Sequence, residues 1–159
     1  MAQPGTMVDP RQPRLGQGIT GVMALAGFLL DAPVVLPVLA VILTAASLLG
    51  AQANPYAWLF RRLRRIGAIG PPRELEEAAP PRFANTVGLV VLSAATVAWY
   101  GFDLTWLAWA LGLLVATLAL LAAVTGLCVG CELYVWARRV ATGGRIRGRL
   151  VRPVEGARG

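Results

Sequence analysis

Apolar residues dominate three long runs of the chain, and polar or proline-containing segments separate them. The first run covers residues 15–53. It is too long for one membrane-crossing helix, because about 20 residues at 1.5 Å each cover the roughly 30 Å of hydrocarbon. Asp31 and Pro33 interrupt it, since proline lacks an amide donor and aspartate favours the membrane interface. The run therefore predicts two helices, at about residues 15–30 and 33–53.

The two later runs predict two further helices. One covers about residues 83–102, which is close to the length of a single span. The other covers about residues 104–128 and continues as helix to residue 140, further than one span requires. The pattern is that of an all-α integral membrane protein with four transmembrane helices, which together form one membrane domain over residues 15–140.

Polar segments flank this domain and divide it. We expect residues 1–14 to form a polar arm, residues 67–82 a solvated linker rich in proline and glutamate, and residues 141–159 a basic disordered tail. A further segment, residues 56–66, follows an N-cap signal formed by asparagine and proline.

This segment places three apolar residues on one helical face and most of its arginines elsewhere. The apolar residues are Leu59, Leu63 and Ile66. Such spacing predicts a short basic amphipathic helix in the headgroup plane, after the second transmembrane helix. A charged loop that stops the second helix is the alternative.

Composition and charge support a membrane location. The chain is 57% apolar and only 14% charged, against roughly 25% charged residues in soluble domains. All fifteen basic residues are arginines, and four spans place every one of them on one side. Arginine-rich segments stay cytoplasmic, so both termini are expected on the cytoplasmic side of the membrane, with the arginine-rich face on anionic lipid. We expect neither a cofactor nor a nucleic-acid partner.

The candidate chemistry lies in the only two cysteines, Cys128 and Cys131. Residues three apart on a helix share a face, and the predicted orientation puts this CxxC pair near the cytoplasm. Cytoplasmic thiols are kept reduced, which argues for a dithiol that cycles, carries sulfur or binds metal. Gly126 and Gly130 allow a plainer alternative, in which the small residues only let helices pack closely.

Other polar side chains are expected at the same level of the membrane and are candidate supporting residues. Arginines favour the thiolate, whereas a nearby glutamate and the negative C-terminal end of a continuous helix oppose it. A break at either glycine would restart the helix and reverse that second effect. The supporting residues are Arg14, Gln17, Arg82, Asn85 and Glu132.

Four motifs carry a family resemblance. They are Val8-Asp9-Pro10-Arg11 with Arg14 and Gln17, Asn54-Pro55-Tyr56, Pro81-Arg82-Phe83-Ala84-Asn85 followed by Gly88, and Thr125 to Tyr134. Together they resemble the bacterial membrane family called domain of unknown function 4395, although Asn85 replaces an expected glutamine. The resemblance implies a four-helix, multi-pass protein of the bacterial cytoplasmic (inner) membrane with a CxGC motif, often encoded beside thioredoxin-like or rhodanese-like proteins. It implies no established activity.

Three classes of function stay open at this point. The first is thiol-disulfide redox chemistry or sulfur relay at Cys128 and Cys131, with a thioredoxin-like or rhodanese-like partner. The second is a metal site, which would need a dimer because Cys128, Cys131 and Glu132 are too few ligands for tetrahedral zinc. The third is a non-catalytic membrane assembly subunit.

Overall fold

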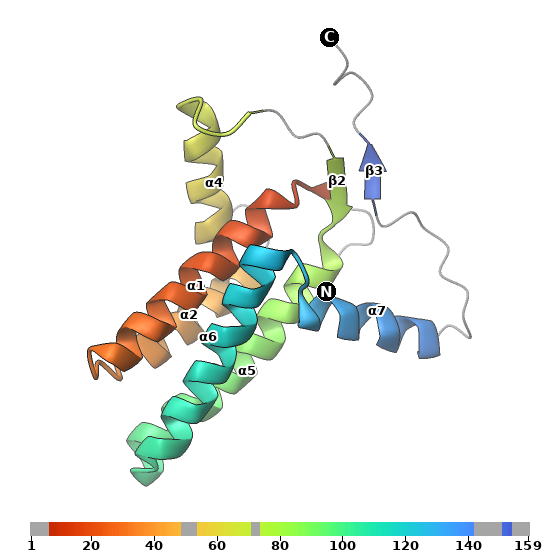
Figure 1. Ribbon diagram of the computed structural model, residues 1–159. Coiled ribbons are helices and arrows are strands. Elements are labelled where there is room, and N and C mark those ends of the chain that lie inside the picture. Colours follow the sequence, from red (N-terminus) through yellow and green to blue (C-terminus); the bar gives the residue numbers. More distant parts are fainter. Residues whose placement is uncertain (1–6, 49–53, 71–73, 142–150, 154–159) are drawn as a thin grey trace.

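A computed structural model describes residues 7–48, 54–70, 74–141 and 151–153 of the chain (Figure 1). Six helices and three short strands lie within these ranges. The helices are α1 (Arg11–Leu29), α2 (Val35–Leu48), α4 (Pro55–Arg65), α5 (Ala79–Phe102), α6 (Thr105–Thr125) and α7 (Val129–Ala141). The strands are β1 (Met7–Val8), β2 (Glu74–Glu77) and β3 (Val151–Pro153).

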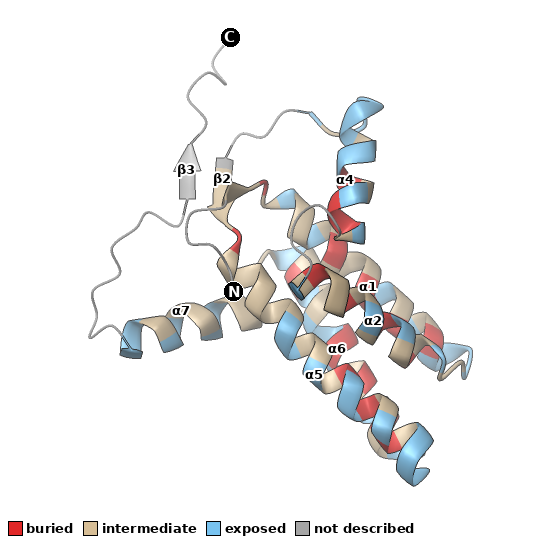
Figure 2. Cartoon of the chain, turned by 180° about the vertical axis from the view of Figure 1, so that it is seen from behind, coloured by how far each residue is buried: buried red, intermediate tan, exposed pale blue. Residues whose placement is uncertain are grey.

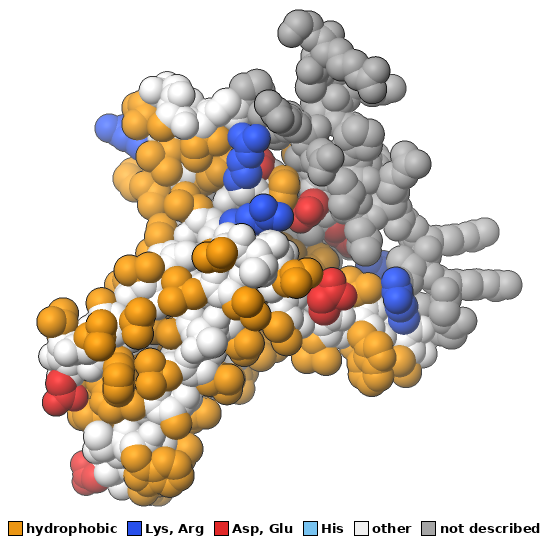
Figure 3. Space-filling view, viewed as in Figure 1, with side chains coloured by type: hydrophobic (Ala, Val, Ile, Leu, Met, Phe, Trp, Pro, Cys, Tyr) orange, Lys and Arg blue, Asp and Glu red, His pale blue; other side chains and the backbone are white. Residues whose placement is uncertain are grey.

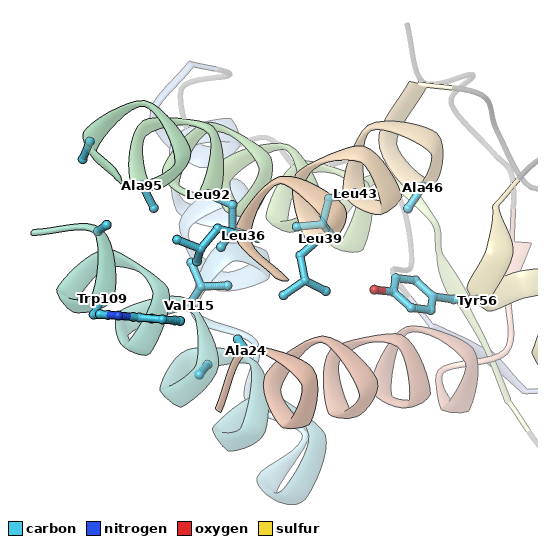
Figure 4. Close-up of a cluster of buried hydrophobic side chains, with 13 residues drawn as sticks. Ala24, Leu36, Leu39, Leu43, Ala46, Tyr56, Leu92, Ala95, Trp109 and Val115 are labelled. Atoms are coloured by element: carbon cyan, nitrogen blue, oxygen red, sulfur yellow. The ribbon is translucent and has the colours of Figure 1, made fainter. Parts of the chain in front are cut away.

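Four of the helices, α1, α2, α5 and α6, run together as a bundle, while α4 and α7 project from one end of it (Figure 1). Helix α1 packs mainly on α6, and α2 packs mainly on α5. Leu36, Leu39 and Leu92 are fully buried between the helices, with the Trp109 ring beside them (Figure 4). These contacts hold the four helices together as one bundle.

The outer surface of the bundle is apolar. Many large hydrophobic side chains of the bundle helices are exposed, and they cover much of the visible face (Figure 3). Helices α5 and α6 are long and apolar enough to cross a membrane, yet only 17% and 33% of their most apolar stretches are buried (Figure 2). The core helix of a soluble protein would be mostly buried, so this surface is better suited to lipid.

Helices α1 and α2 differ from the expected spans. Helix α1 begins at Arg11, four residues before the expected start, and α2 has 14 residues, with residues 49–53 outside the described part of the chain. By length and composition, therefore, two of the described helices qualify as spans.

The six helices confirm the expected all-α class, and a short three-stranded antiparallel sheet in the order β1-β2-β3 is an addition that was not expected. Met7 pairs with Glu77, and Leu75 pairs with Arg152. Strand β2 lies in the expected solvated linker, and β3 lies in the expected disordered tail, of which residues 142–150 and 154–159 are outside the described residues. Strands of two to four residues are too short to show a period-2 pattern, so the sequence does not signal them.

The C-terminal end of the expected linker is helical, because α5 begins at Ala79 rather than near residue 83. Two prolines occupy its first turn, where a missing amide hydrogen costs no helical bond.

Helix α4 confirms the predicted short basic helix. The Asn54 side chain caps it by accepting hydrogen bonds from the amides of Tyr56 (2.9 Å) and Ala57 (3.2 Å). Its buried face is formed by Tyr56, Ala57 and Phe60, whereas Ile66 is 68% exposed, so the expected apolar face is wrong in part. Its location in the headgroup plane stays a prediction.

Candidate functional site

The site is formed where the expected long helix is interrupted at Gly126. The expected continuous helix to residue 140 is wrong, because α6 ends at Thr125 and α7 starts at Val129. Gly126 has a φ of 77°, a left-handed conformation that glycine adopts without steric cost. The Leu127 amide donates to Oγ1 of Thr125 at 3.1 Å, and α7 then leaves in a new direction (Figure 1).

Arg14 from α1 lies against this turn. A Cβ atom added to Gly126 would lie 2.5 Å from Nη2 of Arg14, which means that the guanidinium rests on bare backbone. The turn therefore needs glycine for its φ angle, and an added Cβ would only displace the flexible end of the Arg14 side chain.

Cys128 immediately precedes α7 and caps it. Its Sγ accepts hydrogen bonds from the Cys131 amide and from Nε2 of Gln17, both at 3.3 Å, while its carbonyl oxygen accepts from the Glu132 amide at 3.0 Å. A side chain that accepts from the amide three residues on is the N-cap arrangement. The thiol consequently lies at the positive end of the α7 dipole, the reverse of its place in a continuous helix.

This geometry separates the acidities of the two half-buried thiols. The Cys131 side chain, by donating a hydrogen bond, lowers the pKa of Cys128 to about 6 against the opposing effect of burial, with the Cys131 and Gly130 amides and Gln17 assisting. The pKa of Cys131 is raised by the same hydrogen bond, by burial, and by the negative charges of Cys128, Glu76 and Glu132. Cys128 is thus the thiolate of the pair and Cys131 its proton-bearing neighbour.

Both cysteines line an open cleft of about 230 Å³. Three of the five predicted supporting residues, Arg14, Gln17 and Glu132, share this cleft with them. The cleft carries charge of both signs beside the sulfur atoms, and it is large enough to admit a side chain from another protein.

Two residues of the cleft were missed by the sequence analysis. Glu76 and Glu77 of β2 form part of its wall, although they were assigned to a solvated linker. Nη1 of Arg138 on α7 lies 3.5 Å from Oε1 of Glu77 and connects α7 to the sheet. Only the repeated acidic residues at positions 74, 76 and 77 hinted at a role, and nothing in the sequence linked them to the cysteines.

The other two predicted supporting residues do not line this cleft. Arg82 and Asn85 instead border a smaller cavity of about 40 Å³ beside Tyr56. Asn85 also borders an apolar cavity of about 120 Å³, which Cys128 and Gln17 border as well. Asn85 therefore shares a cavity with Cys128 but not the cleft that both cysteines line.

Helix α7 packs on α5 beside the site. A Cβ on Gly130 would lie 2.7 Å from that of Ala84, and the rings of Phe83 and Tyr134 are 5.6 Å apart. Gly130 thus has the packing role that its small size suggested, alongside the dithiol.

A metal centre within one chain has little support. No group of three or more histidine, cysteine or acidic side chains is placed to hold a metal ion within the described ranges. The metal alternative still requires a second copy of the chain.

The fold and the site define a helical-bundle protein with a half-buried dithiol at a helix N-terminus. The chain belongs to the family described as Domain of unknown function (DUF4395), which matches residues 8–139 and therefore includes the whole bundle and both cysteines. The predicted family is confirmed. No curated protein and no solved structure matches the chain.

Proposed function

We propose that this chain is a multi-pass protein of the bacterial cytoplasmic membrane whose Cys128–Cys131 pair exchanges electrons with a protein dithiol. One observation carries the proposal: Sγ of Cys128 caps α7 and accepts hydrogen bonds from the Cys131 amide and Gln17. A thiolate held in this way is both a nucleophile and a good leaving group.

The same interactions favour one direction of exchange. Because they stabilise the Cys128 thiolate, they stabilise the reduced pair, and a stabilised reduced form makes the corresponding disulfide a better oxidant. The Cys128–Cys131 disulfide is therefore the form that accepts electrons, and a thioredoxin-like dithiol is a suitable donor.

The exchange balances in two steps. A partner thiolate attacks Sγ of Cys128, the bond between the two cysteines breaks, and Cys131 leaves with the electron pair and takes up a proton. The second partner thiolate then attacks the partner sulfur of the mixed disulfide and releases Cys128 as a thiolate. The partner dithiol becomes a disulfide, and the pair gains two electrons.

The membrane location is supported by the apolar outer surface and by the segregation of arginine. Four spans with both termini inside put every arginine on the cytoplasmic side, together with the cleft. There a soluble thioredoxin-like protein can reach the pair. A rhodanese-like donor would meet the same thiolate, but the Cys131 thiol beside Cys128 favours closure to a disulfide over storage of a persulfide.

Mixed-disulfide trapping in membrane vesicles tests the proposal. Full-length Cys131→Ser and Cys128→Ser variants are first activated with dithionitrobenzoate, which leaves an aromatic disulfide on the remaining cysteine. They then meet a thioredoxin that retains only its attacking cysteine. We expect a covalent adduct with Cys131→Ser and little with Cys128→Ser, formed only when the cytoplasmic face is accessible. Equal adducts from both variants, or adducts from the opposite face, would contradict the proposal.

A further inference from the structure

The apolar cavity that borders Cys128 has a composition unlike that of the charged cleft. Residues of α1, α2, α5 and α6 line its walls, and most of them are apolar. Three lining residues, Val87, Leu114 and Leu118, are 38%, 49% and 38% exposed, so the cavity reaches the apolar outer surface of the bundle. It therefore connects a lipid-facing surface with a reactive sulfur atom.

The proposed exchange leaves a question that this cavity answers. A pair that accepts electrons from a dithiol must pass them on, and the chain has no other cysteine and no histidine. These 159 residues therefore contain no second dithiol. The acceptor must be a separate molecule with its own route to Cys128.

On the basis of the proposed function, we propose that this cavity binds a lipid-soluble quinone, which oxidises the Cys128–Cys131 pair. The apolar walls of this cavity of about 120 Å³ suit a quinone ring, and its tail would lie on the lipid-facing surface that the cavity reaches. The amide side chains of Gln17 and Asn85, which border the same cavity, offer donors to the carbonyl oxygens. A lipid acyl chain would fit the apolar walls, but it has no atom that could accept a hydrogen bond from these amides.

The oxidation balances without a further reagent. Sγ of the Cys128 thiolate bonds to a ring carbon, and the displaced electron pair moves to a quinone oxygen. Cys131, having lost its proton to that oxygen, attacks Sγ of Cys128. The bond between sulfur and carbon then breaks, with its electron pair left on the ring. One proton from solvent completes the quinol, so the dithiol loses two electrons and the quinone gains them.

Bonding of Cys128 to the quinone ring favours the later attack by Cys131. The Cys128 thiolate is itself a main cause of the raised pKa of Cys131. Once Cys128 is covalently bound its charge is gone, so Cys131 gives up its proton more readily.

The test uses the full chain in phosphatidylcholine vesicles, reduced, freed of reductant and kept anaerobic. Decylubiquinone is added, quinol is followed by absorbance, and free thiols are counted by mass spectrometry. We expect one quinol per protein with loss of both thiols, and no reaction in Cys128→Ser.

Cavity variants show where the quinone binds. Val91 lines the cavity, whereas its neighbour Val90 is 63% exposed, so Val91→Trp and Val90→Trp form a matched pair. Val91→Trp should slow quinone reduction about tenfold or more, which is one 1.4 kcal/mol step, and Val90→Trp should not. Ala119→Phe fills the same cavity from α6 and is a second, independent variant in case Val91→Trp does not fold. Reaction with dithionitrobenzoate through the cleft should stay unchanged in all three.

Two results would overturn the inference. In one, dithionitrobenzoate oxidises the pair but decylubiquinone leaves it reduced, which refutes the quinone and spares the proposed function. In the other, both cavity-filling variants reduce quinone at the parent rate. If instead neither reagent oxidises the pair, the proposed function fails along with the inference.

Discussion

Replacing Cys131 by alanine or by serine isolates the contact that most lowers the pKa of Cys128. Both variants leave Cys128 as the single thiol. Serine keeps a hydroxyl donor beside Sγ, and alanine removes it. A hydrogen bond to a charged acceptor is worth roughly 1.5–3 kcal/mol, and one pKa unit is about 1.4 kcal/mol. From a starting pKa of about 6, Cys131→Ala should therefore raise the pKa of Cys128 by about one to two units.

Iodoacetamide alkylation of the full-length protein, followed by mass spectrometry across pH, measures this shift. The sign is fixed by the depressed pKa: reactivity persists above about 6 and is lost as the pH falls through that value. At pH 5 about 9% of Cys128 is thiolate, against about 0.03% of an ordinary cysteine with a pKa of about 8.5. The thiolate fraction of Cys128 is thus roughly 300-fold larger at this pH. A thiolate of lower pKa is also a weaker nucleophile, which reduces this advantage by about 13-fold.

Cys128 should consequently react about 20-fold faster than a model thiol at pH 5, but only about twofold faster at pH 7. The acid limb of the profile is thus the informative part. Identical midpoints in Cys131→Ala and Cys131→Ser would show that the side-chain donor is irrelevant. A midpoint near 8.5 in Cys131→Ser would refute the activated thiolate altogether.

Two further predictions follow from the turn and the cap. Gly126→Ala and Gly67→Ala both place alanine at a φ near 77°, but only Gly126 meets the Arg14 guanidinium, whereas a Cβ on Gly67 meets nothing within 4 Å. The guanidinium is the far end of a flexible side chain and can move aside, so each substitution should cost about 1–2 kcal/mol, measured by denaturation in detergent, and a negligible loss would contradict the left-handed turn. Gln17→Leu removes a donor to Sγ of Cys128 and should raise the pKa of Cys128 by less than Cys131→Ala does. The same alkylation profile measures this shift, and an unchanged midpoint would show that the Gln17 hydrogen bond does not affect the pKa.

The sequence predicted the helices of the bundle because long apolar runs and proline signals are local properties. Asn54 followed by proline correctly marked the start of α4, and the four motifs identified the family. The sequence also predicted that Arg14, Gln17 and Glu132 lie beside the cysteines, since polar residues at helix ends collect at one level. The number of spans and the orientation remain predictions from arginine counting.

The tertiary structure decided what surrounds the sulfur atoms. Glu76 and Glu77 reach the cleft through pairing of β2 with strands far away in the sequence, which leaves no local pattern. Arg82 has the expected position at the start of α5 but borders a different cavity, because helix rotation depends on packing rather than on depth.

The largest difference between the sequence prediction and the structure lies at Gly126. A glycine within an apolar run is compatible with a continuous helix, and the sequence could only state that a break would reverse the helix dipole at the cysteines. The fold makes the break, since the close approach of Arg14 and the packing of Gly130 on Ala84 are available only when α7 turns away from α6. The sequence by itself determined that a dithiol lies at the end of a helical bundle. Tertiary packing decided that this dithiol begins a helix instead of ending one, and the positive end of that helix favours the thiolate.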